Sequence, residues 1–114
     1  MPHGLASGRT ICDHEFVMVD FGCNCGGYWS DVTRTVCVGE PNAKQREIYE
    51  TVLAAQNAAI LLAAPGKTGR ELDHAARTLI ADAGYDEYFG HNPGHSFGLN
   101  IHEAPQCARN QNGA

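Results

Sequence analysis

Basic residues are scarce in this sequence of 114 residues, and no long apolar run occurs in it. Eight Lys and Arg residues stand against 13 Asp and Glu residues, which gives a formal net charge of −5. A nucleic-acid-binding surface would show a basic patch, so this balance argues against nucleic acid and favours a cationic partner such as a metal ion. The longest apolar run, residues 58–64, falls far short of the roughly 20 residues that cross a membrane, so no membrane span is expected.

No secretory leader is readable at the start of the sequence, and the number of cysteines is odd. The segment Met1–Gly4 has neither the basic nor the apolar region of a signal peptide. The five cysteines cannot all pair, and reduced thiols are typical of the cytoplasm. The length is that of one domain. We therefore expect a cytoplasmic protein with one domain and free thiols.

The order of the predicted elements indicates an α+β fold. Residues 15–21 and 28–38 have the composition of strands, and a glycine-rich turn at 22–27 separates them. After two helices, a glycine-rich loop leads to a predicted short strand at 97–102. The polar residues 106–114 are predicted to form a loose tail, which leaves 1–105 as the folded portion.

Two capping boxes mark the starts of the two helices. Asn42 with Gln45 opens a helix predicted over 42–64, and Thr68 with Glu71 opens a second that ends at Gly84. In each helix the apolar residues recur at helical spacing and predict one buried stripe. The predicted stripes are Ile48, Val52, Ala55, Ala59 and Leu62 in the first helix, and Leu72, Ala75, Leu79 and Ala83 in the second.

Two short motifs suggest other chemistries. Gly94–Gly98 matches the G-x-S-x-G elbow of serine hydrolases, but the acid Glu103 directly follows the base His102, which is the wrong order for that class. Cys23 and Cys25 suggest a small zinc site with two further cysteines, although their spacing is shorter than the usual C-x₂-C. The zinc site stays an alternative that cysteine-to-serine changes and metal analysis would test.

Two carboxylates stand in the predicted strand pair. If the turn is centred between Cys25 and Gly26, paired residues have indices that sum to 51, and Asp20 then faces Asp31. Facing carboxylates repel, so such a pair would be retained for a shared proton or a bound cation. If a bulge shifts the register, both are ordinary surface acids.

Three of the six histidines, His91, His95 and His102, lie within twelve residues of a glycine-rich stretch. Histidine is the commonest metal ligand and carries protons near neutral pH. Carboxylates with imidazoles suit Mn, Co, Zn or Fe better than calcium. The residues thus predict a divalent metal site with acid–base groups beside it, or a chance cluster of loop histidines.

Four motifs occur in a familiar order: V-D-F-G at 19–22, G-Y-W-S-D-V-T-R-T at 27–35, F-G-H-x-x-G-H at 89–95 and G-L-x-I-H-E-A-P at 98–105. They resemble the pita-bread metallopeptidase family, to which methionine aminopeptidase and creatinase also belong. The resemblance is greatest to its Xaa-Pro aminopeptidase and Xaa-Pro dipeptidase branch. It implies that residues 1–105 form the N-terminal portion of the catalytic domain, with an antiparallel sheet covered by two helices.

The resemblance also implies roles for individual residues. Asp20, Asp31 and His95 would be metal ligands, with Asp31 bridging two divalent ions, of which Mn is expected and Co or Zn are alternatives. His91 and His102 would act as catalytic residues beside the substrate, and His3 would line the substrate pocket. The implied substrates are short peptides with proline at the second position, and a homo-oligomer is left open.

The implied reaction is attack by a metal-bridging hydroxide on the bond between an N-terminal residue and proline. The family uses two further Glu ligands downstream of the I-H-E-A-P segment, and these are not within the sequence. We therefore expect the 114-residue chain alone to be inactive. The alternative is a non-catalytic binding module with the same fold.

Overall fold

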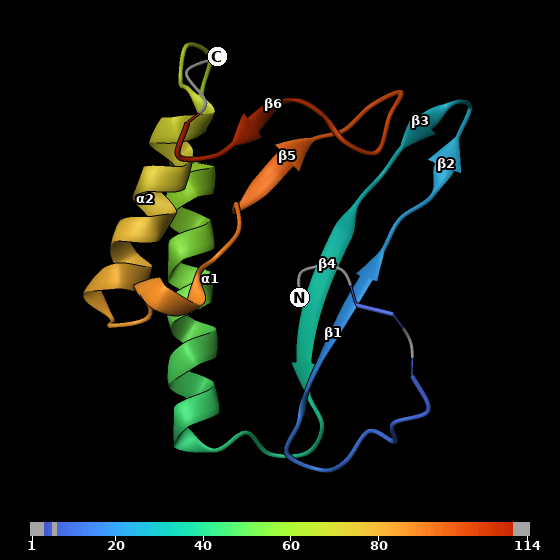
Figure 1. Ribbon diagram of the computed structural model, residues 1–114, viewed down its shortest axis with the longest axis vertical. Coiled ribbons are helices and arrows are strands. Elements are labelled where there is room, and N and C mark those ends of the chain that lie inside the picture. The colour runs from blue at the N-terminus through green and yellow to red at the C-terminus, as the bar shows by residue number, and fades with distance from the viewer. Residues whose placement is uncertain (1–3, 6, 111–114) are drawn as a thin grey trace.

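The computed structural model describes residues 4–5 and 7–110 (Figure 1). It confirms an α+β fold in which two helices accompany small antiparallel sheets. The elements, in chain order, are β1 (Phe16–Phe21), β2 (Asn24–Cys25), β3 (Tyr28–Trp29), β4 (Val32–Cys37), α1 (Ala43–Leu62), α2 (Gly69–Asp82), the 3₁₀ turn η1 (Asp86–Tyr88), β5 (Gly94–Ser96) and β6 (Glu103–Cys107). Strands β1 and β4 pair, β2 and β3 continue that ribbon to its tip, and β5 pairs with β6.

The register of the first ribbon differs from the predicted one by two positions. Asp20 pairs with Thr33 and Cys25 with Tyr28, so paired indices sum to 53 instead of 51. The difference arises because Gly26 and Gly27, with φ of 60° and 89°, form the two turn residues and move the turn centre one position along the chain. Asp20 therefore does not face Asp31 directly.

Both helices form where the capping boxes predicted them. Asn42 accepts a hydrogen bond from the Gln45 backbone N–H and caps α1, and Thr68 does the same for Glu71 at the start of α2. Helix α1 ends at Leu62, two residues before the predicted end. The left-handed Gly84 (φ 83°) lies one position after the C-cap residue of α2.

The buried face of α2 is rotated from the predicted apolar stripe. The structure buries Asp73, Ala76 and Ile80, whereas Leu79 is 39% exposed. The predicted stripe followed the leucines and alanines of this helix. An aspartate is found on the inner face because a neighbouring arginine pairs with it, as described below.

The hydrophobic core is confined to the helix pair. Ala55 of α1 packs with Ala76 and Ile80 of α2, and Tyr85 and Phe89 cover one end of this cluster. The Cα radius of gyration is 15.7 Å, against about 13 Å for a compact chain of this length. The molecule is therefore open: the described part of the chain packs the β5–β6 hairpin against α2 but places no helix on the β1–β4 ribbon (Figure 1).

The predicted strand at 97–102 is wrong, because these residues form the connection between β5 and β6. The Glu103 carboxylate accepts a hydrogen bond from the Asn100 backbone N–H at 2.8 Å and closes this connection. Strand β6 continues to Cys107, where its backbone lies against Gly69 of α2, so residues 106 and 107 are not part of a loose tail.

Membrane-spanning helices and disulfides are both absent from the described residues. No helix among them is long and apolar enough to cross a membrane. All five cysteines carry free thiols.

Candidate metal centre

The candidate site lies where the β1–β4 ribbon approaches the β5–β6 hairpin. Asp31 precedes β4, and His95 is the middle residue of β5. Their side chains are 25% and 27% exposed, and the His95 Nε2 atom lies 3.5 Å from the Asp31 Oδ2 atom. Residues 64 positions apart in the chain are thus brought together with an imidazole nitrogen directed at a carboxylate.

The tautomer of His95 follows from its other ring nitrogen. Nδ1 lies 3.1 Å from the backbone carbonyl oxygen of Ser96. A carbonyl oxygen only accepts hydrogen bonds, so Nδ1 carries the proton and donates it. In the neutral ring, Nε2 then holds the lone pair, and this is the nitrogen that faces Asp31. Such a hydrogen bond from the second ring nitrogen is typical of histidines that bind metal ions.

His102 lies beside His95. The centroids of the two rings are 4.3 Å apart, at an interplanar angle of 44°. The connection that carries His102 is attached to the ribbon, because the Trp29 backbone N–H donates to the Gly98 carbonyl at 2.7 Å. This hydrogen bond joins the ribbon tip to the β5–β6 connection, so it helps to hold His102 and His95 near Asp31.

Asp20 lies on the neighbouring strand and has a different partner. Its Oδ1 atom accepts a hydrogen bond from the Thr33 hydroxyl at 2.8 Å, and the residue is exposed. The two ladders on either side of residues 22–23 and 30–31 keep the same index sum, and in the break between them Gly22 lies against the backbone of Ser30 and Asp31.

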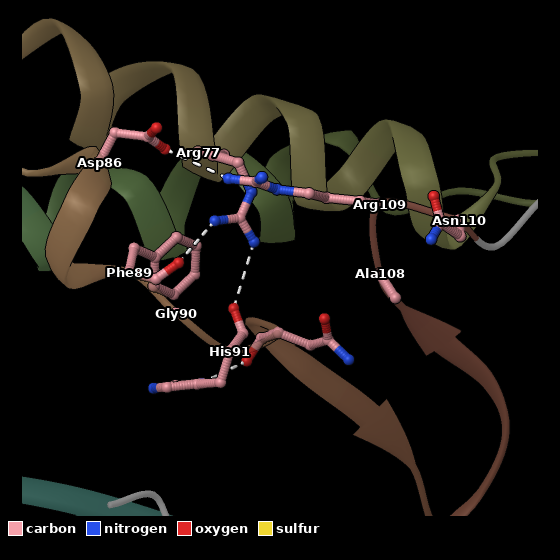
Figure 2. A pocket seen from close by; sticks show the side chains of 9 residues that line it. Arg77, Asp86, Phe89, Gly90, His91, Ala108, Arg109 and Asn110 are labelled. Carbon is pink, nitrogen blue, oxygen red and sulfur yellow. Dashed lines mark hydrogen bonds and ion pairs between the residues drawn. The ribbon is translucent and has the colours of Figure 1, made fainter.

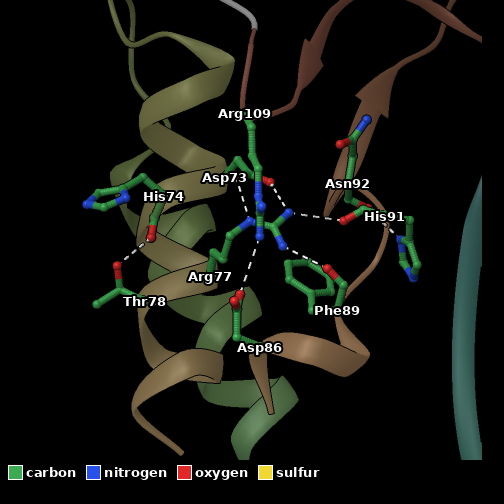
Figure 3. A network of polar contacts seen from close by, with 9 residues as sticks. All are labelled: Asp73, His74, Arg77, Thr78, Asp86, Phe89, His91, Asn92 and Arg109. Carbon is green, nitrogen blue, oxygen red and sulfur yellow. Dashed lines mark hydrogen bonds and ion pairs between the residues drawn. The ribbon is translucent and has the colours of Figure 1, made fainter. Parts of the chain in front are cut away.

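His91 precedes β5 and is exposed. Its Nδ1 atom donates to the carbonyl of Asn92 at 2.8 Å, and its ring points away from α2, towards the side where the ribbon lies (Figure 3). The ring also meets Phe89 edge-on, with centroids 5.5 Å apart. His3, predicted to line the substrate pocket, lies outside the described residues.

The residues fit a divalent ion in chemistry. Two ligands that each stand about 2.0–2.2 Å from one ion are roughly 3.0–3.5 Å apart, and the Asp31–His95 distance of 3.5 Å falls at the upper end of that range. The set is not a complete cage: among residues 4–5 and 7–110, no three His, Cys, Asp or Glu side chains form a cluster that could hold a metal. The same finding leaves the cysteine zinc site without support.

The sequence did not predict one polar arrangement that supports the segment before β5. Asp73 and Arg77 of α2 form a buried ion pair that holds the segment before β5 (Figure 3). The available signal was an aspartate followed four positions later by an arginine on a helix with a narrow apolar stripe. That spacing also occurs on exposed helix faces, so it does not by itself predict a buried pair.

An antiparallel ribbon and a hairpin packed on a helix direct a carboxylate and an imidazole at one point, and these are ligand types that the metal centres of hydrolases use. The comparison with protein families agrees with this class. Residues 1–114 match the model of metallopeptidase family M24, so the chain belongs to that family.

Relatives and solved structures give the same result in more detail. The chain is 50% identical over 109 residues to the Xaa-Pro dipeptidase of Pyrococcus horikoshii, a match that covers 96% of this chain and 31% of the relative. The prolidase structure from Pyrococcus furiosus superposes with a TM-score of 0.94 at 49% identity, over 97% of this chain and 33% of that one. The Xaa-Pro dipeptidase from Bacillus anthracis also gives 0.94 at 49% identity, over 99% and 32%.

These likenesses confirm the predicted family resemblance and a partial pita-bread fold. The chain spans about a third of the length of the relatives that it matches. The family match extends over residues 106–114 as well as over the portion predicted to carry the resemblance.

Proposed function

We propose that the chain is the N-terminal portion of the catalytic unit of an Xaa-Pro metallopeptidase. Such an enzyme hydrolyses the bond between an N-terminal residue and proline in short peptides. The observation that carries the proposal is the approach of His95 Nε2 to Asp31 Oδ2, in a chain that belongs to a metallopeptidase family. Asp31 and His95, together with Asp20 of β1, would hold divalent ions. The proposed set is two ions, with Mn²⁺ expected and Co²⁺ or Zn²⁺ as alternatives.

The chemistry that such ions supply when bound is activation of water and polarisation of the scissile carbonyl. The chain's own residues complete the site. His95 presents its Nε2 lone pair because Nδ1–H is donated to the Ser96 carbonyl. His91 and His102 lie on either side of β5 in sequence, where they can contact the substrate. His91 has its Nδ1 proton fixed on the Asn92 carbonyl, so its Nε2 atom is the one that can accept or deliver a proton.

The 114-residue chain by itself is proposed to be inactive. The described residues provide no cluster of three metal-binding side chains, and the family resemblance calls for two further Glu ligands. A centre with so few protein ligands would bind an ion weakly and leave its position poorly fixed.

A chimera tests the proposal directly. The matching 109-residue portion of the Pyrococcus horikoshii Xaa-Pro dipeptidase is replaced by the corresponding residues of this chain. Release of the N-terminal amino acid from an Xaa-Pro dipeptide is then followed with Mn²⁺ supplied. We expect turnover by the chimera, none by the 114-residue chain, and loss of turnover in the chimera with His95→Ala.

The control is the chimera with Asp82→Ala, which removes an exposed carboxylate from the end of α2 far from the predicted ligands in sequence. A folded chimera without activity would support the alternative of a non-catalytic binding module. Activity that survives His95→Ala would show that the centre does not use His95.

A further inference from the structure

A guanidinium group is buried between α2 and the segment that precedes β5. The Arg77 side chain is 12% exposed, and that of its partner Asp73 is 2% exposed. Arg77 donates two hydrogen bonds to Asp73, from Nε to Oδ2 at 3.0 Å and from Nη2 to Oδ1 at 2.8 Å (Figure 3). This fork-to-carboxylate geometry fixes the plane of the guanidinium, which a single hydrogen bond would not do.

The remaining donors of Arg77 reach across to another part of the chain. Nη1 donates to the Phe89 carbonyl at 2.8 Å, and Nη2 donates to the His91 carbonyl at 3.1 Å (Figure 2). The guanidinium carbon also lies 4.3 Å from the centroid of the Phe89 ring, within the range of a cation–π contact. Arg77 therefore holds the backbone on both sides of Gly90.

The charge of Arg77 does not vary in the working pH range. The hydrogen-bonded Asp73 carboxylate raises the pKa of Arg77 above its usual range, more than burial lowers it. Arg109, which lines the same pocket as Arg77, pairs with Asp86 at 3.4 Å (Figure 2). Among the described residues, the side-chain hydrogen bonds to the carbonyls of Phe89 and His91 come from Arg77, while the Phe89 N–H donates to the Asp86 carbonyl.

The segment held by Arg77 leads directly to the candidate site. His95 follows His91 by four positions, and His95 is the residue that approaches Asp31. The other strand of this hairpin is also attached to α2, because Gly69 lies against the backbone of Gln106 so closely that a Cβ atom would stand 2.0 Å from its carbonyl oxygen. Helix α2 thus contacts β6 directly and holds, through Arg77, the segment that leads into β5.

We propose that Arg77, oriented by Asp73, is a positioning residue of the candidate site: it fixes the Phe89–His91 backbone and thereby sets how His91 and His95 stand relative to Asp31. The His91 ring points away from Arg77, and only the His91 carbonyl meets it, so Arg77 acts through the backbone and does not itself contact the reacting groups (Figure 2). This inference rests on the proposed function in that the site is taken to be a metal centre, but the placement of His91 and His95 relative to Asp31 can be measured without that assumption.

The test uses the full 114-residue chain with Arg77→Lys. Lysine keeps a positive charge beside Asp73, but one ammonium group cannot replace the planar fork that reaches a carboxylate and two carbonyls. Nuclear Overhauser effects between the His95 ring and the Asp31 side chain report the site without metal, and Mn²⁺ affinity reports it with metal. The control is Arg70→Lys, which makes the same change at an exposed position of the same helix.

In the Arg77→Lys chain we expect the His95–Asp31 cross-peaks to weaken or vanish while the helical circular dichroism is retained. Mn²⁺ binding should weaken by about tenfold, the lower end of what loss of a residue supporting a metal ligand costs. Arg70→Lys should leave both readouts at the wild-type level. If Arg77→Lys does not fold, Asp73→Asn carries the test, because it keeps the Arg77 donors and loosens only their orientation.

The proposal would be overturned if the folded variant kept the wild-type cross-peaks and the wild-type Mn²⁺ affinity and only its melting temperature fell. Arg77 would then be a residue that stabilises α2. If the wild-type chain binds no Mn²⁺ at Asp31 and His95, the proposed function fails instead. The metal-free cross-peaks still decide the positioning role in that case, so the two failures are distinguishable.

Discussion

Replacing Gly22 by alanine tests whether the candidate site depends on a close approach of two backbone segments. Gly22 follows β1 and lies against the backbone of Ser30 and Asp31. A Cβ atom at this position would lie 2.0 Å from the Ser30 carbonyl oxygen and 3.0 Å from its carbon, whereas ordinary contacts begin near 3.4 Å. Both obstructing atoms belong to the backbone, so the two strands must separate by more than an ångström.

The expected cost is that of an overpacked site, about 1–3 kcal/mol in the free energy of unfolding. For a chain of this size, each 1 kcal/mol lowers the melting temperature by roughly 4–8 °C. Because Asp31 directly follows Ser30, the same movement displaces the carboxylate from His95, and Mn²⁺ affinity should fall together with stability.

Thermal and urea unfolding followed by circular dichroism measure the first effect, and Mn²⁺ titration of the folded protein measures the second. Gly8→Ala is the matched control, since a Cβ atom at Gly8 meets nothing within 4 Å. If Gly22→Ala matched Gly8→Ala in both stability and Mn²⁺ affinity, the reasoning about the close approach would be refuted.

Two further predictions concern titratable groups on and beside α2. Hydrogen bonds from Lys67 and from the Thr68 N–H lower the pKa of Glu71 from 4.5 to about 2, so the stability that this carboxylate contributes is present above pH 4.5 and is lost as the pH falls towards 2. The wild-type melting temperature should therefore fall more steeply over that range than that of Glu71→Gln. Burial raises the pKa of the Cys107 thiol, so Cys107 should react with a disulfide reagent at pH 8 more slowly than the exposed Cys25. The two rates are measured on single-cysteine variants, and equal rates would contradict this prediction.

The helices were predictable because their signals are local. A capping box and an apolar period act within a few residues, and both helices begin where Asn42 and Thr68 predicted them. The buried face of α2 was not predictable in the same way. It depends on Asp73 being paired by Arg77, and on carbonyls of residues 89 and 91 that approach from a distant segment.

The strands show the same limit. The pairing of the first two strands was predicted correctly, but their register depends on which two residues form the turn. The prediction centred the turn between Cys25 and Gly26, whereas Gly26 and Gly27 take the left-handed conformations. The last strand was placed wrongly because its partner contacts are tertiary. Strand β6 is fixed by β5 and by Gly69 of α2, not by a strong pattern of its own.

The candidate site was predictable as a set of residue types, not as a geometry. The approach of Asp31 to His95 is an outcome of the fold, since Asp31 precedes β4 of one sheet and His95 lies in β5 of another. Asp20 was expected to face Asp31 and instead accepts a hydrogen bond from Thr33. The roles of Asp20, His91 and His102 remain proposals that rest on the family resemblance.

Titration calorimetry with Mn²⁺ tests the central claim most directly, namely that Asp20, Asp31 and His95 belong to a metal centre. The comparison is between the wild-type chain, the Asp20→Ala/Asp31→Ala double variant and Asp82→Ala as a control for lost carboxylate charge. We predict weak saturable binding by the wild type and the control, and none by the double variant. Equal heats from the wild type and the double variant would contradict the account.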